Sequence, residues 1–338
     1  MSNVLAAMVD AIRKVHDAIR DVVVTATEQQ HLDWLSRVHR EVDEDTIYAI
    51  DTVSEQRLLE LFSDFSRHHS FVLIAEGLRK GSVIFPSGVV ESEAEWRIIV
   101  DPIDGTRGLM YQKRSGWILT GVAPNRGAET SLQDVVCAVQ TEIPLIKQHL
   151  SDQLWAIRGE GASSQRFNRL TKQCTTLQLR PSGSSTIAHG FATIARFFPG
   201  LRDELAALDD EIVQAVLGMG SPGKAQCFED QYISTGGQLY ELIAGHDRFV
   251  ADLRPLLQQL LEERGLPRGL CCHPYDLCTE LIASESGVVV TDAVGAHLNA
   301  TLDVESDVAW IGYANQQIRQ QMEPALQRAL QRRGWMRI

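Results

Sequence analysis

The chain has 338 residues, of which 44% are hydrophobic and 22% charged, as in an ordinary soluble globular protein with one large α/β domain or two coupled subdomains. Its formal net charge of -12 argues against a general nucleic-acid-binding surface, because such surfaces are basic. An anionic substrate would need a metal ion or a local basic patch to offset this background charge.

The first segment, residues 4–27, has the spacing of apolar residues that is typical of an amphipathic helix. Five apolar residues are predicted to share its buried face: Val4, Met8, Ile12, Val15 and Ile19. An acidic residue, Asp10, interrupts this segment early, so we expect neither a signal peptide nor a membrane span. The six scattered cysteines favour reduced thiols in a cytoplasmic protein, and a zinc cluster of Cys272, His273 and Cys278 is a weak alternative.

Helical and strand-like patterns then alternate along the chain. A helix is predicted within residues 51–67, followed by strands at 71–75, 95–100, 115–123 and 133–140 and a hairpin-like segment at 153–162. Residues 166–185 are rich in Thr, Ser and Gly and are interpreted as the connection between two subdomains. Beyond them we expect helices within 204–218, 238–245 and 275–287 and at the C-terminus, with strands near 246–252, 288–292 and 308–314. These patterns predict a layered α/β protein with an N-terminal part, 1–165, and a C-terminal part, 166–338.

The segment DPIDGT, residues 101–106, follows one of these apolar strands directly. Pro102 has no N–H to donate, so strand pairing is predicted to stop there, and Gly105 permits a backbone conformation that other residues resist. Asp101 and Asp104 repel each other unless a cation lies between them, and Mg²⁺ takes such oxygen ligands together with substrate phosphate oxygens. The alternative is an ordinary turn in which Asp and Gly serve only the backbone.

Three further acids bear on this choice. Glu76 ends another apolar strand, whereas Asp51 and Asp276 each stand near a predicted helix start. Surface exposure or helix capping explains each of them singly. Together they place acids at strand ends and helix starts, where α/β folds usually build their sites.

These segments, in order from about residue 45 to 313, resemble the inositol monophosphatase superfamily of Mg²⁺-dependent, often lithium-sensitive phosphatases. The resemblance rests on DPIDGT, on IAEG around Glu76, on STGGQLYELIAGHDRFVAD at 234–252 and on PYDLCTELIASESGVVVTD at 274–292. It implies an alternating α-β-α-β-α sandwich with a site shared between its two halves. It also suggests a homodimer.

The resemblance carries over to named positions of this sequence. Two or three Mg²⁺ ions would be bound by four carboxylates and one backbone carbonyl, those of Glu76, Asp101, Asp104, Asp276 and Ile103. Gly105 and Thr106 would hold the phosphate. Asp51, Thr106 and Glu76 are the expected catalytic residues, Thr106 and Asp51 orienting and helping to deprotonate the attacking water. The implied activity is hydrolysis of a small soluble phosphate ester, an inositol phosphate or a related sugar phosphate, by metal-activated water.

Several positions depart from the family pattern. Gly77 stands where the family has a second acid after Glu76, and Gly269 stands where inositol phosphatases often have an acid that contacts the substrate's hydroxyls. The first difference bears on how tightly a third metal ion would be held, and the second weakens the case for inositol phosphate itself.

Three cations, Arg107, Lys113 and Arg114, follow the motif. They form either a solvated basic loop or a subsite for a second anionic group, and we expect Arg107 and Arg114 to bind substrate. The sequence DGTRG is similar to the DGTKG of 3'(2'),5'-bisphosphate nucleotidases, which are the alternative within this superfamily. A non-catalytic ligand-binding member is the alternative of another class. Neither a nucleic acid polymer nor a membrane is expected as a partner.

Overall fold

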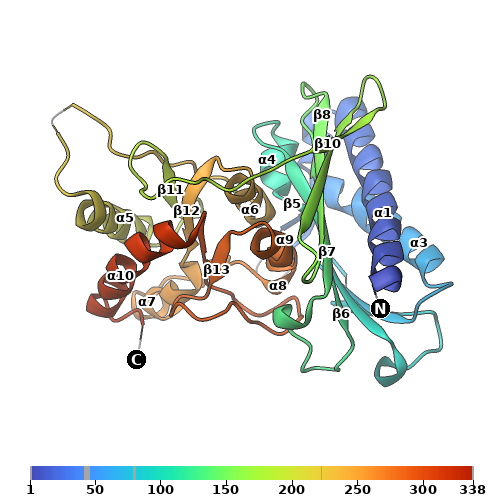
Figure 1. Cartoon of the computed structure of the whole chain (residues 1–338). Helices are drawn as coiled ribbons and strands as arrows, with labels where there is room; N and C mark the ends of the chain where they lie inside the picture. Colours follow the sequence, from blue (N-terminus) through green and yellow to red (C-terminus); the bar gives the residue numbers. More distant parts are fainter. Residues whose placement is uncertain (1, 42–45, 79–80, 222, 337–338) are drawn as a thin grey trace.

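The structure, a computed structural model, describes residues 2–41, 46–78, 81–221 and 223–336. Its described residues form an eight-stranded and a four-stranded sheet with helices outside and between them (Figure 1). This is the alternating α-β-α-β-α arrangement that the resemblance implied. A separate antiparallel pair, β1 (Val38–Glu41) and β2 (Thr46–Tyr48), precedes the large sheet.

The larger sheet has the strand order β10-β9-β8-β7-β6-β5-β3-β4. Its strands are β3 (Phe71–Ala75), β4 (Ser82–Phe85), β5 (Trp96–Asp104), β6 (Gly116–Pro124), β7 (Cys137–Ile143), β8 (Leu150–Ile157), β9 (Ala162–Asn168) and β10 (Cys174–Leu177). Only β3 and β5 pair in parallel among these described strands. Every residue of β3 and β5 is buried, as expected for the centre of a covered sheet.

Two helices, α1 (Ser2–Gln29) and α3 (Ala49–Phe65), cover one face of this sheet (Figure 1). Met8, Ile12 and Ile19 of α1 are fully buried against the sheet, which confirms the predicted helix face. Val4 was wrongly placed on that face and is 44% exposed, because Leu5 fills the buried position one turn before Met8. A short helix, α2 (Leu32–Leu35), links the two.

The smaller sheet has the order β11-β12-β14-β13 and lies between two further helical layers (Figure 1). Its strands are β11 (Phe191–Ile194), β12 (Asp247–Asp252), β13 (Val289–Thr291) and β14 (Trp310–Tyr313). The layer between the sheets consists of α6 (Thr235–Ile243), α8 (Pro274–Leu277) and α9 (Glu280–Glu285). The outer layer consists of α5 (Arg202–Leu217), α7 (Gln258–Glu263) and α10 (Gln316–Arg332).

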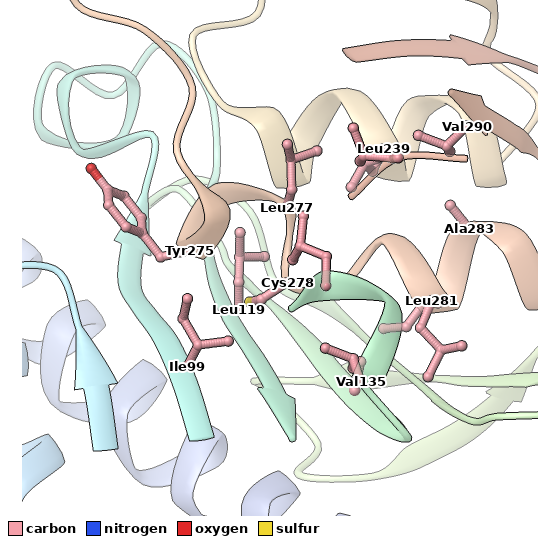
Figure 2. Close-up of a cluster of buried hydrophobic side chains, with 14 of the residues drawn as sticks. Ile99, Leu119, Val135, Leu239, Tyr275, Leu277, Cys278, Leu281, Ala283 and Val290 are labelled. Carbon is pink, nitrogen blue, oxygen red and sulfur yellow. The ribbon is translucent and has the colours of Figure 1, made fainter. Parts of the chain in front are cut away.

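Apolar packing ties the middle layer to the larger sheet. Figure 2 shows Ile99 and Leu119 of that sheet near Leu277 and Cys278, all within one buried cluster. The approach is close at Gly121 of β6, where an added Cβ would lie 2.7 Å from the Cys278 carbonyl oxygen. This contact fixes the C-terminal end of α8 against the middle of β6, next to the strand β5 that carries Asp101 and Asp104.

Two predicted boundaries differ from the observed elements. The division after residue 165 falls inside β9, and the segment interpreted as a connection contains β10, because both strands complete the larger sheet. The helix predicted at 275–287 is split into α8 and α9. Thr279, at the break, donates a buried hydrogen bond of 3.0 Å to Gln140 of β7, so tertiary packing overrides the helical period there.

No helix in the part of the chain that the structure describes is long and apolar enough to span a membrane.

Candidate metal and phosphate site

The first four residues of the DPIDGT segment, 101–104, form the end of β5 rather than a turn that terminates it. Asp101 pairs with Leu119, and Asp104 pairs with Trp117. The three residue steps from Asp101 to Asp104 in β5 therefore lie opposite only two steps in β6, from Leu119 to Trp117. The prediction that strand pairing stops at Pro102 is therefore wrong. The extra residue makes a β-bulge, which accommodates a proline without an N–H and lets side chains three positions apart point to the same side.

A third acid reaches the bulge from the start of α8. Pro274 begins this helix, and the backbone N–H of His273 donates a 2.7 Å hydrogen bond to Asp276 Oδ2. Helix capping thus holds Asp276 in place, as the sequence suggested. Oxygen atoms of Asp101, Asp104 and Asp276 all lie within 4.8 Å of one another.

Burial makes this acidic cluster of Asp101, Asp104 and Asp276 electrostatically costly. Burial and then the charge of Asp276 raise the pKa of Asp104 to about 8, although hydrogen bonds from Ser234 and Gly236 work in the other direction. Burial, followed by the charges of Glu76, Asp104 and Asp276, raises the pKa of Asp101 well above its usual range. Buried carboxylates that repel one another are suitable oxygen donors for a hard divalent cation, so the chemistry of the cluster fits a bound metal ion.

The zinc alternative does not gain support from the geometry. Among the described residues, the three aspartates are the group of metal-ligating side chains that converges, and Cys272, His273 and Cys278 do not form another. Burial raises the pKa of the Cys272 and Cys278 thiols well above the usual range, which disfavours thiolate ligands.

The residues after the bulge form a tight loop. Gly105 has a φ of 86°, in the left-handed region, and an added Cβ would lie 3.0 Å from Ser234 Cβ. A side chain there would be strained by both the backbone and the neighbour. The loop leads into a five-residue helix, α4 (Thr106–Met110).

Thr106 connects this loop to the helix α3. Its Oγ1 lies 2.9 Å from Asp51 Oδ1 and 2.9 Å from the carbonyl oxygen of Ile103, so its one proton has two acceptors. The other carboxylate oxygen of Asp51 accepts a 2.8 Å hydrogen bond from the backbone N–H of Tyr48. The structure thus brings together the pair that the resemblance named for handling the water.

One pocket, of about 660 Å³ including its open mouth, collects most of the predicted site residues. Its lining includes Asp51, Glu76, Asp101, Ile103, Asp104, Gly105, Thr106, Arg107 and Asp276. Arg114 is not part of this lining. It forms an ion pair with Asp230, and its guanidinium lies 4.8 Å from the ring centre of Tyr232, so acidic and aromatic neighbours draw it away from the loop.

Several residues in the pocket lining or directly behind it were not predicted as site residues from the sequence. Ser234 donates a 2.8 Å hydrogen bond to Asp104, and the N–H of Gly236 donates one of 2.6 Å to the same oxygen. The STGG motif at 234–237 carried a signal for these two. Phe197, Phe198 and Arg254 carried none, since they lie outside recognisable motifs and reach the pocket only through the folding of the second half.

Comparisons with known proteins agree with this fold. The sequence profile of the inositol monophosphatase family matches residues 1–196, more than half of the chain. No curated protein sequence matches this chain.

Three solved structures share the fold at low sequence identity. The extragenic suppressor protein suhB of Bartonella henselae has 17% identity and a TM-score of 0.63, covering 95% of this chain and 98% of that one. A fructose-1,6-bisphosphatase of Leishmania major has 12% identity and a TM-score of 0.67, with 94% and 92% covered. An IMPase of Thermotoga maritima has 16% identity and a TM-score of 0.59, with 98% and 99% covered. By its sequence profile and its fold, the chain belongs to the inositol monophosphatase family of phosphatases.

Proposed function

We propose that the protein is a Mg²⁺-dependent phosphomonoesterase that hydrolyses a small soluble phosphate ester, an inositol phosphate or a related sugar phosphate. The observation that carries the proposal is the convergence, in one pocket, of the acidic cluster and the Thr106–Asp51 pair. One group binds a cation and the other handles a proton, and hydrolysis of a phosphate ester by water needs both.

The acidic residues serve to hold the metal. The expected ligands are the carboxylates of Glu76, Asp101, Asp104 and Asp276 and the carbonyl oxygen of Ile103, all of which line the pocket. When bound, two or three Mg²⁺ ions would polarise the phosphoryl group, stabilise charge on the leaving oxygen and increase the acidity of water.

Thr106 and Asp51 serve to position the water and take its proton. A hydroxyl that donates to a carboxylate still has lone pairs with which to accept a hydrogen bond. While Thr106 donates to Asp51, it can accept a hydrogen bond from a water molecule and orient it toward the phosphorus. A proton leaving the water then passes through the Thr106 hydroxyl to Asp51 Oδ1, 2.9 Å away. Glu76, in the same lining, would assist this step.

The loop residues serve to hold the phosphate. Gly105 and Thr106 lie in the pocket lining, and the left-handed conformation of Gly105 turns the backbone there from β5 into α4. Backbone N–H groups in such a turn are suited to phosphate oxygens. We therefore assign the scissile phosphate to this loop.

A bisphosphate nucleotidase is the second candidate within the superfamily. The DGTRG sequence and the place of Arg107 in the lining favour it. A non-catalytic ligand-binding member is less favoured, because all four expected carboxylate ligands are retained in the pocket. Lithium sensitivity, a homodimer and a cytoplasmic location stay predictions from the resemblance.

The test is phosphate release from a panel of inositol, sugar and nucleotide esters, with Mg²⁺ and with a chelator. We expect release only with Mg²⁺, and we expect Asp104→Asn to reduce it about a thousandfold. Absence of release from every ester would refute the enzyme assignment. Undiminished turnover in Asp104→Asn would refute the site assignment instead.

A further inference from the structure

Part of the pocket lining is cationic and aromatic rather than acidic. The guanidinium carbons of Arg107 and Arg254 lie 5.3 Å and 5.2 Å from the ring centre of Phe198. Arg254 also lies 4.5 Å from the ring centre of Phe197, and Arg107 lies 5.8 Å from that of Tyr48. We call Arg107, Phe197, Phe198 and Arg254 the arginine–phenylalanine wall.

Arg254 is held firmly in this wall. Its Nε donates a 2.8 Å hydrogen bond to Oδ1 of Asp252, its Nη2 donates to Oδ2 of the same carboxylate, and its Nη1 donates 2.7 Å to the Leu270 carbonyl. Asp252 has no exposed surface. Such bidentate pairing, with rings beside the guanidinium, removes the conformational freedom that an arginine usually loses on binding a ligand.

The guanidinium still has donors to offer. An arginine has five N–H groups, and the three hydrogen bonds above use one hydrogen on each nitrogen, leaving one on Nη1 and one on Nη2. The side chain is 11% exposed and lines the pocket. Burial acts to lower its pKa, but the Asp252 carboxylate outweighs this and the pKa is raised, so the group stays cationic.

The wall and the acidic cluster line the same pocket. Arg107, Phe197, Phe198 and Arg254 stand in its lining together with Asp101, Asp104 and Asp276. A ligand bound at the acidic cluster therefore lies in the same pocket as the Arg254 guanidinium.

We propose that Arg254, with Arg107 beside it, binds a second anionic group on the alcohol part of the substrate and so selects doubly anionic esters. Arg254 is the specificity-determining residue and Asp252 its positioning residue. The ring faces of the wall are associated with guanidinium groups, which favours an anion over a stacked aromatic base. The inference rests on the proposed function, because it takes the metal-binding end of the pocket as the place of the first phosphate.

The test uses ligands that cannot be hydrolysed, so it does not depend on turnover. Alkane α,ω-bisphosphonates from propane to hexane and the matching alkylphosphonates are titrated calorimetrically into the protein with Mg²⁺. We expect at least one bisphosphonate to bind about 10-fold more tightly than its monophosphonate, which corresponds to about 1.4 kcal/mol. In Arg254→Gln this preference should fall to about twofold or less, with the loss mainly on the bisphosphonate.

Three variants keep the result interpretable. Arg254→Gln alone leaves Asp252 as a buried unpaired charge, so Asp252→Asn/Arg254→Gln serves as the neutral pair, with folding checked by circular dichroism. Arg254→Lys should restore part of the preference through its charge but not the fork geometry. Arg114→Gln is the matched control and should keep the full preference, since Arg114 lies outside the pocket lining.

The possible outcomes separate the two proposals. If no bisphosphonate binds more tightly than its monophosphonate, or if Arg254→Gln and the neutral pair weaken both ligands equally, the second-anion site is wrong. If the preference is found but no ester is hydrolysed, the second-anion site is supported and the proposed function fails. Turnover without a preference supports the function and overturns this inference.

Discussion

Two groups of buried polar side chains pack against the larger sheet. The members of one group form hydrogen bonds with one another, whereas the members of the other repel one another. Beneath α1, the fully buried ring of His16 lies 2.7 Å from the Thr120 hydroxyl and 2.9 Å from that of Thr141. Facing α6 and α8, Asp101 and Asp104 are buried among like charges.

The difference separates structural from functional burial. A buried ring with hydrogen bonds to both nitrogens stabilises one packing arrangement of α1 on β6 and β7. Carboxylates that repel each other in a low-dielectric site cost stability unless a cation joins them. Substituting His16 should therefore change the free energy of unfolding and leave catalytic activity intact. Substituting a residue of the acidic cluster should instead lower catalytic activity and leave the folded state stable.

The largest effect is expected from Asp104→Asn. In the proposed mechanism it removes a metal-ligand charge, so kcat/KM should fall about a thousandfold, or about 4 kcal/mol of transition-state stabilisation. The amide oxygen can still accept from Ser234 and Gly236, so the metal-free protein should unfold at the same urea concentration as the wild type or a higher one. A large loss of stability in the variant would mean that Asp104 is structural.

Thr106→Val should have the next largest effect. The isosteric change removes the hydroxyl that, in the proposed mechanism, joins Asp51 to the water, so kcat should fall about a hundredfold, in the range of general acid–base effects. Thr106→Ser is the control and should keep most of the activity, because it retains the hydroxyl. Steady-state kinetics on both variants decides, and equal activity in Val and Ser forms would exclude the hydroxyl from the reaction.

The third prediction concerns the group beneath α1. Burial, with a smaller contribution from Arg20, lowers the pKa of His16 from 6.5 to about 3. An unfolded chain protonates this ring below pH 6.5 while the folded one does not, so the stabilisation is complete above pH 6.5 and is lost as the pH falls toward 3. Between pH 6.5 and 5 the free energy of unfolding should fall by about 2 kcal/mol.

His16→Gln tests this by removing the titrating group. Urea unfolding curves of the variant should show a shallower fall in stability between pH 6.5 and 5, while kcat/KM at neutral pH stays within about twofold of the wild type. If the free energy of unfolding of the variant fell as steeply with pH as that of the wild type, His16 would not be the source of this pH dependence.

The smallest effect is expected from Arg114→Gln. Arg114 pairs with Asp230 at a half-exposed site, and such pairs contribute about 0–1 kcal/mol to stability. Because it lies outside the pocket lining, KM should change less than about twofold. A larger rise in KM would restore the substrate-binding role that the sequence suggested for it.

The sequence predicted most of what local patterns encode. The layered α/β class and the face of α1 followed from apolar periodicity, and the alternating α-β-α-β-α order followed from the family resemblance. The three aspartates followed from motifs at strand ends and helix starts. The bulge at Pro102 did not, because its register depends on how β6 pairs with β5. The split between α8 and α9 likewise depends on the bond between Thr279 and Gln140, which are distant in the sequence.

The arginine–phenylalanine wall shows the same limit. Phe197 and Arg254 are separated in the sequence, and no periodicity or motif connects them. They meet because the residues that follow β11 and β12, which pair in parallel, emerge side by side. Arg107 and Arg114, by contrast, are near neighbours in sequence, yet only Arg107 lines the pocket. Arg114 instead pairs with Asp230, so closeness in sequence does not by itself place two side chains in one pocket.

The most direct test of the central claim is the effect of Mg²⁺ on thermal unfolding of the wild type and Asp101→Asn. The neutral amide side chain of the variant should relieve the repulsion within the acidic cluster, and it should also weaken metal binding. The account predicts that, without metal, the variant melts at the same temperature or higher, and that millimolar Mg²⁺ raises the Tm of the wild type only. An equal shift in both proteins, or none in the wild type, would contradict the assignment of these carboxylates to a metal.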